Sequence, residues 1–259
     1  MQANDELVAA RVAIVELLAE IEDIELRQNP RIEAEWQVVI GVWENKLLEA
    51  QIAMRRAKRR YNMVQACVNT EKPVDMDEIE SKLDTEFEQW KQQLDSAVNT
   101  YQAAVAAQMT AVHIDMEEAR AQKRLFRKLA KRLHPDLNPG LNEQAQRMFE
   151  LAKLAYQQGD RKILESLEIS TRSLEPDPWL PETLVEAQAE LAVLEGQGRE
   201  LEQRIANIKA EKPYCLRALL NDSAWVEAHI KQLQIDLKKC QVSENDYNRR
   251  CEESMEQND

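Results

Sequence analysis

Apolar residues recur at spacings of three and four along most of this chain, and few residues interrupt the pattern. The stretches Asp5–Gln28 and Met76–Val112 each carry one narrow apolar stripe of this kind. Only 5 of the 259 residues are Gly and 8 are Pro, and the commonest residues are strong helix formers. A narrow stripe needs a second helix to cover it. The pattern therefore predicts an all-α protein built from long, paired helices.

Prolines mark the predicted ends of the N-terminal helices. Pro30, in "RQNP", is expected to end the first helix, because the residue before a proline is pushed out of helical geometry. Pro73 separates a second helix, Arg31–Thr70, from the third, Met76–Val112. We expect these two helices to fold back on each other as an antiparallel coiled-coil hairpin. Residues 1–112 are thus predicted to form an N-terminal helical hairpin.

The C-terminal part is predicted to repeat this arrangement. Residues 184–259 carry two helical stretches separated by "EKPYC", which we interpret as a second helical hairpin. The proline-rich segment 171–183, with "EPDPWLP", is typical of a stiff linker. Residues 113–170 lie between the N-terminal hairpin and this linker, and they are predicted to form a separate segment. The expected fold is all-α, with long antiparallel coiled-coil hairpins flanking a short helical hairpin.

The charge balance limits the partners that this chain can have. It carries 34 basic and 47 acidic residues, a net charge of -13, which argues against nucleic acid or an anionic membrane as its main target. No apolar run approaches the roughly 18 residues of a membrane span. The four cysteines form no C-x-x-C pair, and the N-terminus lacks the basic start of a signal peptide. We expect a cytoplasmic protein with reduced thiols.

Motifs of catalysis and cofactor binding are missing. The chain has no Gly-rich phosphate loop, no Ser or Cys nucleophile with a suitable His, and no paired acidic metal motif. His113 and His229 have no partner at metal-site spacing. We expect a protein without enzymatic activity, cofactor or metal.

One helix, in "RLFRKLAKRLHPDLNPG", has sharply divided faces. Apolar side chains at spacings of three, four and seven share one face: Phe126, Leu129, Ala130 and Leu133. Basic side chains occupy the opposite side: Lys123, Arg124, Arg127, Lys128, Lys131 and Arg132. A concentrated positive stripe on an acidic protein suits an acidic groove of a partner.

The same helix stops abruptly at His134-Pro135-Asp136. Pro135 has no N–H to donate and disfavours helical geometry at His134. The tripeptide is expected at the tip of a helical hairpin, with Asp136 as an acceptor-only carboxylate and His134 as a donor or acceptor.

These residues resemble the J domains of DnaJ-type co-chaperones. "FRKLAKRLHPD" is similar to the second J-domain helix with its HPD loop, and "FELAKLAY" to the third helix. The resemblance covers about forty of 259 residues, from Lys123 to Arg161. The usual first J-domain helix is missing, so the end of the preceding helix, Tyr101–Val112, would have to replace its packing. The basic pattern of the fourth J-domain helix is absent as well.

The resemblance implies a non-enzymatic co-chaperone that recruits a DnaK-type heat-shock chaperone and stimulates its ATP hydrolysis. The loop contact would be made by His134, Pro135 and Asp136, and the electrostatic contact by the six basic residues from Lys123 to Arg132. The coiled coils would hold a client, a scaffold or a second copy of the chain. The alternative is a structural or assembly coiled-coil protein whose J-like hairpin activates no ATPase.

A second basic cluster, at residues 55–60 in "MRRAKRRYN", leaves two alternatives. It could bind nucleic acid, which would make the affinity fall steeply with salt. We favour the other interpretation, in which acidic residues of the neighbouring helix pair with it, because such charge runs are usual on long helices.

Overall fold

The computed structural model describes residues 2–110, 116–138, 140–174, 181 and 183–256, and no strand occurs within these ranges. This confirms the all-α class. The elements are α1 (Gln2–Asp23), η1 (Ile24–Gln28), α2 (Asn29–Trp36), η2 (Gln37–Gly41), α3 (Val42–Asn69), α4 (Met76–Thr110), α5 (Met116–Leu133), α6 (Glu143–Gln158), α7 (Arg161–Ser170), η3 (Arg172–Leu174), α8 (Leu184–Ala210), α9 (Leu216–Leu220) and α10 (Ser223–Glu256).

The helices gather into two compact units, each built from segments that lie far apart in the sequence. Unit 1 comprises Met1–Ile32 and Ala111–Arg217, and unit 2 comprises Glu33–Thr110 and Ala218–Asp259. This division differs from the four consecutive segments expected from the sequence. Most of the predicted proline-rich linker, including Trp179, lies outside the described residues.

The predicted helix end at Pro30 is wrong. Helical backbone continues from Gln2 to Asn69, with π-helical turns at η1 and η2. In η1 the N–H of Asn29 donates to the carbonyl of Ile24, five residues back. A π turn widens the backbone just before Pro30, which makes room for the ring that would clash in an α-helical turn. The helical run therefore continues through Pro30.

The first predicted hairpin is present within unit 2. The helices α3 and α4 are antiparallel, because Asn45, early in α3, donates to the carbonyl of Ala97, late in α4, whereas Arg56, farther along α3, pairs with Glu80, early in α4. The turn between them starts α4 as expected, since the Asp75 carboxylate accepts from the Glu78 N–H at 3.0 Å. Apolar residues from three helices share this core: Val64, Ile79, Leu83 and Cys251.

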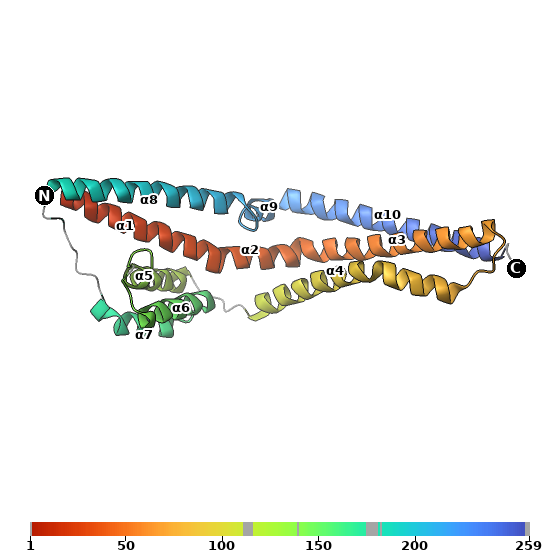
Figure 1. Ribbon diagram of the computed structural model, residues 1–259, viewed down its shortest axis with the longest axis horizontal. Helices are drawn as coiled ribbons and strands as arrows, with labels where there is room; N and C mark the ends of the chain where they lie inside the picture. Colours follow the sequence, from red (N-terminus) through yellow and green to blue (C-terminus); the bar gives the residue numbers. More distant parts are fainter. Residues whose placement is uncertain (1, 111–115, 139, 175–180, 182, 257–259) are drawn as a thin grey trace. The chain divides into compact units, whose positions relative to one another are not determined.

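The predicted second hairpin is wrong, because its two helices have other partners. In unit 2, α10 packs along α3, and Gln65 donates to Ser254 at 2.5 Å. In unit 1, α8 packs along α1 (Figure 1), and Arg11 pairs with Glu190. Both pairs run parallel, so each C-terminal helix lies beside an N-terminal one. A stripe of apolar residues shows that a helix needs a partner but does not specify which helix it is.

The short helices α5, α6 and α7 form a cluster with its own core within unit 1 (Figure 1). Phe126, Phe149 and Tyr156 stack at its centre, with ring centroids of Phe126 and Tyr156 4.4 Å apart. Gly159 ends α6 in a left-handed conformation, φ 72°, as its position in the sequence predicts. The helices α5 and α6 thus form a helical hairpin around this core.

The N-terminal helix of the chain covers this cluster. α1 packs on α5, and η1 packs on α6 with Leu26 against the core. Tyr101–Val112 was expected to provide this packing, but its described residues, 101–110, form the end of α4 and belong to unit 2. The N-terminal helix of the chain, rather than Tyr101–Val112, therefore packs on this cluster.

The parallel pairing of α3 and α10 can be tested by crosslinking. In a variant without the native cysteines, Gln65→Cys with Ser254→Cys is expected to react intramolecularly with a short bifunctional maleimide, because the two native side chains touch. Gel mobility of the denatured chain measures the crosslink. The control pair, Gln65→Cys with Lys231→Cys, is the one that an antiparallel arrangement would bring together. Efficient crosslinking of the control in place of the first pair would contradict the pairing.

Candidate functional site

The turn after α5 is held by backbone and side-chain hydrogen bonds. The carbonyl of His134 accepts from the N–H groups of Leu137 and Asn138, at 3.1 and 3.0 Å. The Asn138 amide donates to the carbonyl of Lys131 at 3.0 Å and so satisfies one of the last carbonyls of the helix. The tip of the hairpin is therefore a capped turn of fixed geometry.

His134 lies inside this turn, which corrects its expected place at the exposed tip. Its side chain is buried against Phe149, with ring centroids 5.2 Å apart. The Nδ1 atom accepts the backbone N–H of Asp136 at 3.1 Å. Burial lowers the pKa of the imidazole, the neighbouring Asp136 raises it, and Lys153 and Arg204 lower it further. His134 thus acts as a neutral support for the tip.

Pro135 and Asp136 are the members of the tripeptide that face solvent. Both residues are exposed, and the Asp136 side chain keeps 69% of its accessible surface. Its backbone is fixed by the bond to His134, so the carboxylate leaves the turn in a defined direction. An exposed carboxylate on a rigid turn can accept an Arg or Lys of a partner.

The exposed basic stripe on α5 is narrower than predicted and begins about one turn earlier in the helix. Four cations form it: Arg120, Arg124, Lys128 and Lys131. At about 100° per residue they fall within a single arc of the helix. Arg120 was not among the predicted cations, although its spacing of four before Arg124 is the signal that places it on this arc.

The other three predicted cations flank this arc and have partners in the chain. Lys123 donates to the buried Asp23 carboxylate at 2.6 Å, and the Tyr156 hydroxyl donates to the same group at 2.5 Å. Gln28 adds a third donor at 3.0 Å. Burial alone would raise the pKa of Asp23, but the bonds from Lys123 and Tyr156 lower it below its ordinary value. This carboxylate joins α1 to both α5 and α6.

Arg127 and Arg132 lie on opposite sides of the arc. Arg127 approaches Glu16 of α1 at 3.7 Å and remains partly exposed. Arg132 is buried against α7, where it donates to the Glu168 carbonyl at 3.0 Å and faces the Glu168 carboxylate at 3.6 Å. These positions belong to the edges where α1 and α7 pack on α5. Arg132 is therefore not presented to a partner, contrary to expectation.

The second basic cluster, at residues 55–60, is engaged within unit 2. Arg56 pairs with Glu80 at 2.6 Å, and Arg59 pairs with Glu86 at 2.9 Å. Both carboxylates come from α4, the neighbouring helix of the hairpin. This agrees with the interpretation that acidic residues of the adjacent helix pair with the cluster, here with Arg56, Arg59 and Arg60.

Among the residues that the structure describes, neither a metal-binding group nor a membrane-spanning helix is found. No group of three or more His, Cys, Asp or Glu side chains there could hold a metal ion. His229 stacks on Trp225, with centroids 4.7 Å apart, and His113 lies outside the described residues. None of the described helices combines the length and apolar character that a membrane span requires.

Comparison of the chain with protein-family models, with curated proteins and with solved structures found no match. The geometry of the α5 stripe and the turn therefore carries the functional argument.

Replacing the buried carboxylate tests the junction of α1 with the hairpin. Asp23→Asn is expected to lower the free energy of unfolding, measured by urea denaturation, by about 1–3 kcal/mol. The reason is that the substitution weakens a buried group that accepts three hydrogen bonds. Since the folded pKa is lowered, the carboxylate contributes stability above the ordinary Asp pKa of about 3.9 and loses it below. The difference from wild type should therefore shrink as the pH falls below about 4.

The control for this experiment is Glu16→Gln, which removes a more exposed partner and should change stability by less than about 0.5 kcal/mol. Equal effects of the two substitutions, or a difference independent of pH, would contradict the assigned role of Asp23.

The protonation of His134 can be followed by long-range proton–nitrogen NMR. We expect a titration midpoint below the ordinary value of about 6.5, with the proton of the neutral ring on Nε2, because Nδ1 accepts a bond. Asp136→Asn should lower the midpoint further, since the carboxylate favours the imidazolium. The support from neutral His134 is present above the ordinary pKa and is lost at lower pH. A midpoint above that of a model histidine would refute this assignment.

Proposed function

We propose that this chain is a cytoplasmic, non-enzymatic co-chaperone that recruits a DnaK-type heat-shock chaperone and stimulates its ATP hydrolysis. The observation that carries the proposal is the exposed Pro135–Asp136 tip on a capped turn, directly after a helix with a solvent-facing stripe of cations. The resemblance of the same residues to J domains supports it. The helices outside the hairpin would choose the client, the location or the oligomeric state.

The electrostatics of the hairpin favour an acidic partner surface. Arg124, Lys128 and Lys131 are exposed and take part in no ion pair of the described chain, while the chain as a whole carries a net charge of -13. Exposed cations attract an acidic surface at long range and orient it before contact. The Asp136 carboxylate then adds one short-range acceptor of opposite sign, which fixes the register of the complex.

The internal pairing of Lys123 and Arg127 defines which part of the stripe would meet the chaperone. Both side chains face α1, at Asp23 and Glu16. The docking contact proposed here is therefore made by Arg120, Arg124, Lys128 and Lys131, together with the tip.

The alternative function is structural, as an assembly protein whose hairpin stimulates no ATPase. The extensive packing of α3 against both α4 and α10, and of α1 against α8, favours this candidate. In that case the bond network at Asp23 would serve only to hold the hairpin in place. The two candidates differ in the role they give to Asp136, which takes part in none of that packing.

Single-turnover ATP hydrolysis by a DnaK-type chaperone distinguishes them. We expect the wild-type chain to accelerate hydrolysis, Asp136→Asn to abolish the acceleration, and Lys131→Glu to reduce it about tenfold at low salt, because charge reversal turns attraction into repulsion. The stimulation should fall as salt rises.

Two exposed positions of unit 2 provide matched controls. Asp95→Asn and Lys58→Glu make the same changes on α4 and α3 and should leave stimulation unaltered. If the wild-type chain is inert while a standard co-chaperone stimulates the same chaperone, the co-chaperone proposal fails and the structural alternative is favoured.

A further inference from the structure

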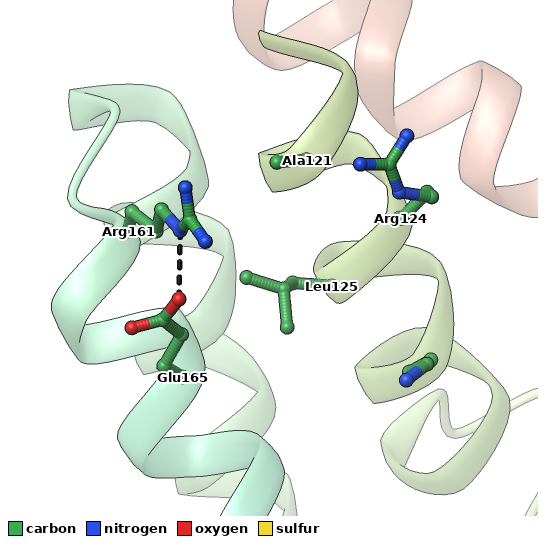
Figure 2. A pocket seen from close by; sticks show the side chains of 6 residues that line it. Ala121, Arg124, Leu125, Arg161 and Glu165 are labelled. Carbon is green, nitrogen blue, oxygen red and sulfur yellow. Dashed lines mark hydrogen bonds and ion pairs between the residues drawn. The ribbon is translucent and has the colours of Figure 1, made fainter. Parts of the chain in front are cut away.

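The two edges of α5 are covered in different ways. On one edge, α7 supplies Leu164 and Leu167 to the shared core, and Leu125 of α5 points toward α7 (Figure 2). The Arg161 guanidinium of α7 is also held there, by Glu165 at 2.7 Å and by a carboxylate of α5 at 2.9 Å. This edge is therefore integral to the cluster of α5, α6 and α7.

The side-chain bonds across the other edge, between α1 and α5, join charged groups. Asp23 accepts from Lys123 at 2.6 Å, and Glu16 lies 3.7 Å from Arg127. Every buried member of the cluster's core comes from α5, α6 or α7, and η1 contributes the half-buried Leu26. By contrast, α1 and α8 share an apolar core of their own. The bond of α1 to α8 is thus apolar, whereas its bond to α5 is electrostatic.

Burial is incompletely compensated on this electrostatic edge. The Nε atom of Arg127 is buried and finds no acceptor among the described residues. Burial also raises the pKa of the Glu22 carboxyl, and the attraction of Lys153 on α6 offsets this only in part. Such groups form hydrogen bonds with water once they are exposed. Their exposure therefore offsets part of the cost of separating α1 from the cluster.

We propose that α1 is an autoinhibitory cover of α5, which opens and closes while α1 stays paired with α8. In the closed arrangement, Asp23 and Glu16 occupy Lys123 and Arg127 as the carboxylates of an acidic partner would. Each of these cations directly precedes a cation of the exposed stripe, so opening widens that stripe. By linkage, a partner that binds the freed cations favours opening to the same extent that α1 weakens its binding.

The effect on ATP hydrolysis rests on the proposed co-chaperone function, but the opening itself does not. Opening is a property of unit 1, and it can be measured on the full chain without any partner. The two parts of the proposal are therefore tested separately.

Thiol labelling of two buried positions measures the opening. Ala19 lies between Glu16 and Asp23 on the same face of α1, and Ala187 lies three residues before Glu190 on the α8 face toward α1. Both alanines keep 2% of their accessible surface. In full-length chains without native cysteines, we expect Ala19→Cys to react with a maleimide at least tenfold faster than Ala187→Cys, because only the α5 edge opens. Mass spectrometry measures both rates.

Charge variants of α1 connect the opening to the ion pairs. At low salt, Glu16→Lys should speed the labelling of Ala19→Cys about fivefold and leave that of Ala187→Cys unchanged, because a cation then faces Arg127. The matched control is Glu6→Lys, the same change at an exposed position of α1, and it should alter neither rate.

Circular dichroism melting confirms that each variant folds. Asp23→Asn is a second opening variant in case Glu16→Lys does not fold, and it should speed labelling at position 19 about tenfold, since it weakens a buried charge-assisted bond.

Single-turnover ATP hydrolysis by a DnaK-type chaperone then tests the autoinhibition. Glu16→Lys should raise the stimulation about threefold over the wild-type chain, whereas Glu6→Lys, which adds the same charge, should not.

Two outcomes would overturn the autoinhibitory cover. The first is equal labelling at positions 19 and 187, which would show that α1 leaves α5 only when unit 1 unfolds. The second is faster labelling at position 19 in a chain that stimulates the chaperone no better than wild type. If position 19 opens but no form of the chain stimulates hydrolysis, the co-chaperone function fails, and the reversible cover is supported without it.

Discussion

The buried Asp23 carboxylate is the interaction on which the arrangement of unit 1 depends. It accepts from Lys123 on α5 and Tyr156 on α6, and it lies on the helix that α8 covers. A carboxylate taken out of water is costly unless donors surround it, so this site strongly favours the one packing that brings those donors together. The consequence reaches the surface: Lys123 and Arg127 of α5 face α1, and the solvent-facing stripe is left to Arg120, Arg124, Lys128 and Lys131.

Local features were predictable from the sequence because their causes are local. The all-α class, the antiparallel pairing of α3 with α4, the α6 end at Gly159 and the exposure of Asp136 all follow from periodicity, short connections or turn chemistry. The partners of α8 and α10 could not be predicted in this way, since any helix with a matching apolar stripe can cover theirs. The continuation past Pro30 was missed because a π turn leaves no clear signature in composition.

In the candidate site, too, local features could be predicted from the sequence, whereas contacts between helices could not. Periodicity placed Arg124, Lys128 and Lys131 on an exposed face. It could not reveal that α1 and α7 pack on α5 at the two edges of that face. Arg132 illustrates the reason: its place on α5 is fixed by the helix, whereas its burial is fixed by Glu168 on another helix. The inward turn of His134 likewise depends on Phe149, a contact across the hairpin.

The parallel pairing sets a limit on when the N-terminal helices find their partners during synthesis. Hydrogen-bonded partners on α1 and α8 are 179 to 189 residues apart, and those on α3 and α10 are 188 to 189 residues apart. At about 5–20 residues per second, a ribosome needs roughly 10–40 s to make the intervening chain. During that time α1 emerges with its apolar stripe uncovered. The nascent chain therefore passes through a stage in which it exposes the kind of surface that chaperones bind.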